Sequence, residues 1–225
     1  MHPNAADWTA YVDGYCERLA PGLLGEPLNT ISNVGFLLAA LAIWRQARGH
    51  VGPRLLAAGL ALVFVASTAF HMLATRWAGA ADSAAIALFV LAYAVVFARV
   101  FLRVPWRWAW LAVPAFLALG VPVVAGADAL GLPGSSYAAP LVALFVLAAL
   151  TARDAAWPVF LAAGGLFGVS LTFRSVDHTV CGSFPPGTHF LWHLLNAVVL
   201  YLVTRTAVTR WVGSPERADP PTAGR

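Results

Sequence analysis

The chain has 225 residues, of which 60% are hydrophobic and only 11% charged, and its mean hydropathy is +0.75. This composition excludes an ordinary water-soluble domain, and since a transmembrane helix needs about 20 apolar residues, the length allows roughly seven spans and no separate soluble domain. The formal charge is +4, but every basic side chain is arginine and the arginines fall at segment ends, which indicates membrane topology and not nucleic-acid binding.

Residues 1–27 contain no apolar signal-peptide core, so we expect them to stay on the chain as an extracytoplasmic N-terminal segment. Residues 28–204 then predict an all-α membrane domain of seven transmembrane helices. In chain order these are Leu28–Trp44, Leu55–Ala74, Ser83–Phe101, Trp108–Val124, Ala138–Thr151, Trp157–Thr172 and Thr188–Thr204. The fifth and sixth are short, and Pro114 is expected to kink the fourth.

The arginines are distributed unequally between the two ends of these helices. Only Arg18, Arg76 and Arg174 fall on one side. Because cytoplasmic loops are enriched in Lys and Arg, the N-terminus is predicted outside and residues 205–225 form a cytoplasmic tail, disordered in its proline-containing part after Gly213. The other side carries Arg45, Arg48, Arg54, Arg99, Arg103, Arg107, Arg153, Arg205, Arg210, Arg217 and Arg225.

Ionisable residues inside the predicted spans mark a candidate site, because they are costly in a membrane. Ser67 and His71 are four residues apart, as are His189 and His193, so each pair shares one helix face. With the N-terminus outside, both pairs and Asp82 reach the outer leaflet. Three imidazoles with an open fourth position are typical of catalytic zinc, and an Asp nearby can orient or deprotonate the bound water. The HExxH pattern is absent.

Each of these residues also has a simpler interpretation. A single His at the end of a span usually bonds a backbone carbonyl, and Ser67 is able to bond back to its own helix. Asp82 is also placed to cap the third predicted helix, and Asn196 to hydrogen-bond a neighbouring helix. The convergence of three His residues with a carboxylate favours the metal site.

Three carboxylates, Asp13, Glu17 and Glu26, precede or adjoin the first predicted span. Hard oxygen ligands of this kind suit Ca²⁺. Composition alone favours an acidic surface segment with helix caps. Cys16 and Cys181 lie on the same outer, oxidising face in the predicted topology, so a disulfide between them is permissible.

Taken together, these motifs resemble the alkaline ceramidase family, which belongs to a superfamily of seven-helix membrane hydrolases that also includes the adiponectin and progestin receptors. The resemblance covers nearly the whole chain. It rests on Glu26-x-x-Asn29-Thr-x-Ser-Asn33, on Ser67-x-x-x-His71 with Asp82 eleven residues later, and on His189-x-x-x-His193. Cys16-Glu17 and Cys181 also match the outer-face disulfide of that family.

The resemblance implies a role for each candidate residue. Zinc would be held by His71, His189 and His193, while Asp82 contacts the zinc water and Ser67 assists the oxyanion. It also implies that calcium is held by Asp13, Glu17 and Glu26. The family runs Asp-Trp-Cys-Glu-x-Asn, whereas here Gly14 and Tyr15 separate Asp13 from Cys16, and Leu19 stands at the Asn position.

The sequence therefore predicts a zinc-dependent intramembrane amidase that hydrolyses the N-acyl amide of a lipid, with ceramide as the leading substrate. The predicted location is the cell membrane, with the active site toward the extracytoplasmic leaflet. The alternative is a receptor-like seven-helix protein with a structural or vestigial zinc, a branch whose orientation is N-inside. A transporter fits poorly, because the ionisable groups are confined to one leaflet with no relay to the other.

Overall fold

The computed structural model describes residues 7–213, in which every regular element is a helix. The helices are α1 (Pro27–Ser32), α2 (Val34–Gln46), α3 (Val51–Leu73), α4 (Arg76–Val100), α5 (Trp106–Ala109), α6 (Ala112–Ala129), the 3₁₀ turn η1 (Ser135–Tyr137), α7 (Ala138–Leu150), α8 (Trp157–Val180) and α9 (His189–Val212). The prediction of an all-α fold is thus confirmed.

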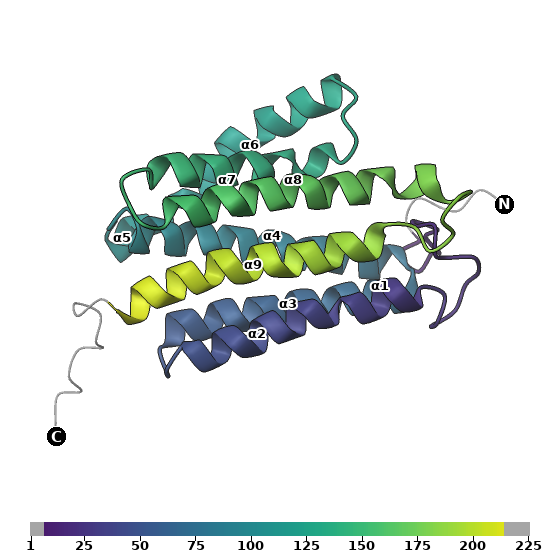
Figure 1. The fold of residues 1–225 in the computed structure, drawn as a ribbon, viewed down its shortest axis with the longest axis horizontal. Coiled ribbons are helices and arrows are strands. Elements are labelled where there is room, and N and C mark those ends of the chain that lie inside the picture. The colour runs from purple at the N-terminus through teal and green to yellow at the C-terminus, as the bar shows by residue number, and fades with distance from the viewer. Residues whose placement is uncertain (1–6, 214–225) are drawn as a thin grey trace.

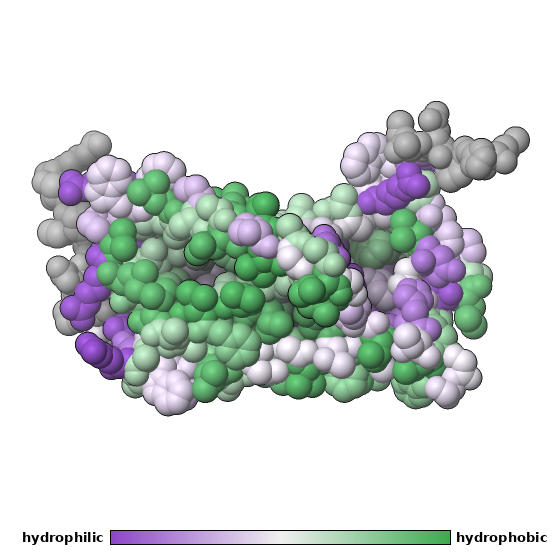
Figure 2. Space-filling model, turned by 90° about the horizontal axis from the view of Figure 1, so that it is seen from above, coloured by the Kyte–Doolittle hydropathy of each residue, from purple (hydrophilic) through white to green (hydrophobic). Residues whose placement is uncertain are grey.

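Six apolar helical segments within residues 7–213 are long enough to cross a membrane. The predicted fifth span is a helix, but with η1 it runs only from Ser135 to Leu150 and is shorter than the others. On the face shown in Figure 2, hydrophobic residues cover most of the middle, and hydrophilic residues lie mainly toward the two ends. The chain therefore has the build of a multi-pass membrane protein. The six segments are Pro27–Gln46, Val51–Leu73, Arg76–Val100, Trp106–Ala129, Trp157–Val180 and His189–Val212.

The long helices form a ring in which each packs against the next (Figure 1). The order is α2, α3, α4, α6, α7, α8 and α9, and α9 closes the ring by packing against α2. The core between α2, α3, α8 and α9 contains fully buried side chains such as Ile43, Leu60, Phe160 and Val208. α6 is the least buried of the six spanning segments, and its C-terminal half leans away from its neighbours (Figure 1). One side of the ring is therefore loosely closed.

The N-terminal segment folds over the end of the ring where α3 turns into α4. Tyr11 forms a β-bridge with Thr75, and the amide of Val12 donates to the carbonyl of Ala74 at 2.8 Å. Ala74 adopts a left-handed conformation, with φ of 47°, which lets the chain reverse within the short connection between α3 and α4. The turn from α8 to α9 lies at the same end (Figure 1). Residues 7–26, His71 and His189 thus meet there.

Several helices extend beyond the predicted boundaries. α4 begins at Arg76, so Asp82 lies inside the helix and the interpretation of Asp82 as an N-cap is wrong. α8 continues to Val180, which makes Asp177 helical. α9 continues to Val212, so residues 205–212 belong to the helical domain and not to a tail. The predicted disorder of residues 214–225 lies outside the described residues.

The chain around Pro114 also differs from the prediction. The segment is divided into α5 and α6, and Pro114 falls in the first turn of α6, whereas Pro122 is the proline inside that helix. A proline is tolerated there because the first helical amides have no partner within the helix.

Candidate metal centre

Three buried imidazoles meet at the covered end of the ring. His71 comes from the last turn of α3, while His189 and His193 lie one turn apart on α9. All three side chains are at most 2% exposed, and one ligand atom from each lies within 4.8 Å of the others. Within residues 7–213 this is the group of His, Cys, Asp and Glu side chains that can hold a metal ion. The expected convergence of the three histidines is confirmed.

Hydrogen bonds fix which nitrogen of two imidazoles carries the proton. Nδ1 of His71 lies 2.5 Å from Oε2 of Glu26, a carboxylate that only accepts, so Nδ1–H donates. The hydroxyl of Ser32 donates to the carbonyl of Asn29 at 2.9 Å, and Nδ1 of His193 lies 2.8 Å from that hydroxyl and 3.1 Å from that carbonyl. Nδ1 of His193 is therefore also a donor. In the neutral form of each ring, Nε2 is left with its lone pair.

These two lone pairs face each other. Nε2 of His71 and Nε2 of His193 are 3.1 Å apart, a distance at which either a proton on one nitrogen or a cation shared by both relieves the repulsion of two lone pairs. Tetrahedral zinc with Zn–N bonds of about 2.0–2.1 Å holds its nitrogens roughly 3.3 Å apart. Nδ1 of His189 is buried, and no hydrogen-bond partner is found for it among residues 7–213. The donor set therefore fits a zinc ion with three nitrogen ligands.

Ser67 and Asp82 lie next to the histidines on the wall of a cavity of about 350 Å³. Ser67 is one turn before His71 on α3, and its hydroxyl interacts with the Asp82 carboxylate on α4. Oδ1 of Asp82 is buried and has no hydrogen-bond partner in the described part of the chain. A carboxylate oxygen and a hydroxyl are thus available beside the three imidazoles.

The cavity continues from the histidines toward the other end of the ring. Its α9 wall runs from His189 to Val203, about 21 Å at 1.5 Å per residue. α4, α6, α7 and α8 contribute mostly apolar side chains to it, and the side of the molecule that carries α6 and α7 is hollowed (Figure 2). The length of about 21 Å along α9 is more than half of the thickness of a hydrocarbon core, which is about 30 Å. An extended apolar chain fits this shape.

The three carboxylates assigned to calcium do not form a common site. Both oxygens of Glu26 are engaged, one by the guanidinium of Arg18 and the other by His71 and Asn29. Glu17 accepts from the amides of Leu28 and Asn29 and so caps α1, while Asp13 is exposed. The buried Arg18 also donates to the carbonyls of His71 and Gly22. The carboxylate oxygens of Glu26 and Glu17 are therefore already engaged within the protein.

Burial of Glu26 works against its ionisation, but the hydrogen bonds outweigh it. Burial raises the pKa of this carboxyl, whereas the bonds from His71, Arg18 and Asn29 lower it, and the net pKa lies below the usual range. Gly25 makes room for the ion pair, because a Cβ at this position would collide with the guanidinium of Arg18. Glu26 is therefore a charged acceptor that holds His71 in place.

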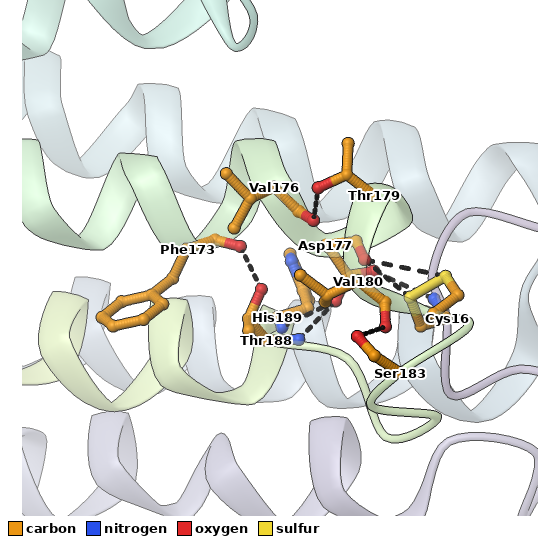
Figure 3. Close-up of a disulfide and its surroundings, with 10 residues drawn as sticks. Cys16, Phe173, Val176, Asp177, Thr179, Val180, Ser183, Thr188 and His189 are labelled. Carbon is orange, nitrogen blue, oxygen red and sulfur yellow. Dashed lines mark hydrogen bonds between the residues drawn. A yellow bond between two sulfur atoms is a disulfide. The ribbon is translucent and has the colours of Figure 1, made fainter.

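The disulfide between Cys16 and Cys181 is present, with the two Cα atoms 5.2 Å apart. Asp177 lies beside it and accepts hydrogen bonds from the amides of Cys16, Thr188 and His189 (Figure 3). This carboxylate caps the first turn of α9 and complements the partial positive charge there. Gly187 has a φ of 65°, and any Cβ on it would collide with Asp177. Asp177 and the disulfide thus join the N-terminal segment to α8 and α9, next to His189.

Two residues at the centre were not predicted as part of the site. Tyr15 stacks on His189 with ring centroids 3.6 Å apart and lines the cavity; burial raises the pKa of its hydroxyl. Arg174, on α8, also lines the cavity. Tyr15 directly precedes a bonded cysteine, a signal in the sequence that it would be held close to that end of the ring. Arg174 gave no such signal, since arginine near a span end usually reports topology.

Comparison of the chain with protein-family models and with curated proteins gives no match.

Proposed function

We propose that the protein is a zinc-dependent membrane amidase that hydrolyses the N-acyl amide of a lipid, with ceramide as the first substrate to test. The observation that carries the proposal is the pair of facing Nε2 atoms of His71 and His193, beside a carboxylate and a hydroxyl at the mouth of an apolar cavity. Three nitrogen ligands with an open position are the pattern of catalytic zinc, and a structural site would use four protein ligands.

Zinc at such a site lowers the pKa of water to about 7 and polarises a carbonyl group. Asp82 accepts the proton of the attacking water and then delivers it to the departing amine, without which an amide nitrogen is a poor leaving group. Ser67 donates a hydrogen bond to the developing oxyanion. The water oxygen bonds to the acyl carbon as the C–N bond breaks, and the products are a fatty acid and a free amine.

The substrate would lie with its acyl chain in the apolar part of the cavity and its amide at the three histidines. Lateral entry beside α6, the least buried spanning segment, is the route that this arrangement favours. The seven-span topology with the N-terminus outside would direct the centre toward the extracytoplasmic leaflet. α7, which lines the cavity, would be the seventh span despite its length.

The receptor-like alternative uses the same histidines without hydrolysis. The buried carboxylate oxygen of Asp82, which has no partner among residues 7–213 and faces the cavity, favours the hydrolase, because a purely structural site has no need of an unpaired acid.

The test is release of fatty acid by purified, zinc-loaded protein in nanodiscs from a panel of N-acyl lipids. Asp82→Asn should lower the rate by about 10²–10⁴-fold, the usual contribution of a general acid and base, with zinc content unchanged. Asp128→Asn, an exposed carboxylate at the end of α6, is the matched control and should leave the rate unchanged. Zinc-loaded wild type that releases no fatty acid from any N-acyl lipid would favour the receptor-like alternative.

A further inference from the structure

A charged side chain that the proposed reaction does not use lies at the depth of the three histidines. Arg174 lines the cavity together with His189, His193 and Asp82. Its position is fixed by its neighbours on the same face of α8. Ser170 donates to the carbonyl of Trp192 at 3.1 Å, and Asp177 accepts from the amide of His189. Since residues 170, 174 and 177 share that face, Arg174 is held against the turn of α9 that carries the histidines.

Aromatic rings hold the guanidinium in place. Its central carbon lies 5.0 Å from the ring centroid of Tyr137 and 5.7 Å from that of Trp192, within the range of cation–π contact. These two rings are themselves in edge-to-face contact, with centroids 4.8 Å apart. The guanidinium of Arg174 therefore has a defined position on the cavity wall.

The charge of Arg174 is not neutralised by a bonded carboxylate in the described part of the chain. No ion pair within 4.0 Å joins it to any acid among residues 7–213, and its Nε is buried without a hydrogen-bond partner. Asp82 interacts with it electrostatically but is not bonded to it. Arg18, in contrast, is paired with Glu26. Arg174 is half-buried, and the side chain of Tyr137 also interacts with it. On a mostly apolar cavity wall, an anion that pairs with this guanidinium is held more strongly than it would be in water.

We infer that the substrate of the proposed amidase carries an anionic group close to its amide, a carboxylate or a phosphate, which pairs with Arg174. This inference rests on the proposed function and names the substrate class of the same site. The planar guanidinium presents parallel N–H donors that match both carboxylate and phosphate. The acyl chain occupies the apolar part of the cavity, and the headgroup lies between α8 and the histidines. Neutral ceramide leaves Arg174 unpaired and is a poorer substrate.

Two pairs of lipids test this directly, because the members of each pair share the acyl amide and differ in whether the headgroup is anionic. N-palmitoylglycine is compared with N-palmitoylethanolamine, and ceramide 1-phosphate with ceramide, using zinc-loaded full-length protein in nanodiscs. The anionic member of at least one pair should have a kcat/KM about 10- to 100-fold higher, the size expected of a charge-assisted hydrogen bond. The two pairs separate a carboxylate from a phosphate headgroup.

Variants assign the preference to this residue. Arg174→Gln should abolish it by raising KM for the anionic lipid while leaving the neutral lipid within about 3-fold, and Arg174→Lys should retain part of it. Arg76→Gln removes the same charge from an exposed position at the same end of the ring and should change nothing. If Arg174→Gln does not fold, the inference is still decided by the preference of the wild type for the anionic lipid and by the preference that Arg174→Lys retains.

Three results would overturn the inference. One is equal or better turnover of both neutral lipids by the wild type. Another is an equal loss on both members of a pair in Arg174→Gln with a shifted pH–rate profile, which would mean that Arg174 acts on Asp82. If the wild type hydrolyses no lipid, the proposed function fails, and native mass spectrometry of lipid binding then decides the inference by itself. Equal affinity for the anionic and the neutral lipid of each pair would then reject the inference that Arg174 pairs with an anionic headgroup.

Discussion

Each imidazole that forms a hydrogen bond at Nδ1 donates it to the segment around α1. Glu26 holds His71, and Ser32 with the carbonyl of Asn29 holds His193. The motif Glu26-x-x-Asn29-Thr-x-Ser-Asn33 thus supplies partners to the histidines and no ligand of its own. Such partners fix the tautomer and the orientation of a ligating imidazole and raise its basicity.

Replacement of Glu26 by Gln should therefore weaken metal binding without removing a ligand. The amide keeps the size of the side chain but loses the charge that polarises His71, and we expect the zinc affinity to fall by about 10- to 100-fold. Competition with a chelator measures this on the purified protein. As a control, Glu17→Gln removes a carboxylate of the same segment that contacts only backbone amides. Equal zinc affinity in Glu26→Gln and wild type would contradict the assigned role.

The same ion pair leads to an expectation about calcium. Because Arg18 supplies the positive charge beside Glu26, added Ca²⁺ or a calcium chelator should leave the zinc content and the melting temperature of the wild type unchanged. Arg18→Gln leaves Glu26 buried without its cation and should be destabilised by roughly 3–5 kcal/mol. Thermal denaturation with and without Ca²⁺ checks both expectations. A clear rise in the wild-type melting temperature with Ca²⁺ would restore the calcium interpretation.

The residues of the centre were predictable to different extents for a physical reason. His71, Asp82, His189 and His193 are conspicuous because ionisable groups rarely occur within apolar runs. Arg18 does not stand out in this way. An arginine that pairs inside the protein and one that marks a cytoplasmic loop have the same sequence signature, and only the path of the folded chain distinguishes them.

At the scale of elements, the disulfide joins the N-terminal segment to the end of α8. It closes a loop with a sequence separation of 165 residues and holds Tyr15 over His189. The double variant Cys16→Ser, Cys181→Ser should be destabilised by about 2–5 kcal/mol. Thermal unfolding measures the effect, and a reductant should lower the melting temperature of the wild type but not that of the variant. Identical melting temperatures for the wild type and the variant, each with and without reductant, would show that the disulfide does not stabilise the fold.

The helix ends were less predictable than the helices. The sequence prediction ended the spans at polar residues, since these normally mark the membrane boundary. In α4, α8 and α9 polar side chains such as Asp82, Arg174 and Thr204 instead face the interior of the ring, and the helices continue past them. Polar residues that line a cavity do not end a helix, because its backbone hydrogen bonds remain intact.

At the scale of the whole molecule, the centre and most of the arginines lie at opposite ends. The histidines, the disulfide and the turn from α3 to α4 occupy one end. The connections from α2 to α3, from α4 to α5 and from α7 to α8 lie at the other, and they carry Arg48, Arg103 and Arg153. By the enrichment of arginine in cytoplasmic loops, we expect the metal centre to face the extracytoplasmic side.

Labelling of single cysteines in a Cys16→Ser, Cys181→Ser background tests this orientation. Thr9→Cys places a thiol in the exposed N-terminal segment, and Ala152→Cys places one in the exposed turn between α7 and α8. A membrane-impermeant maleimide should label Thr9→Cys in intact cells and Ala152→Cys only after permeabilisation. The reverse pattern would turn the cavity toward the cytoplasmic leaflet and match the N-inside orientation of the receptor-like alternative. Labelling of both thiols in intact cells would place the two positions on the same side of the membrane. An even number of spans would then separate them, so α7 or another helix would not cross the membrane.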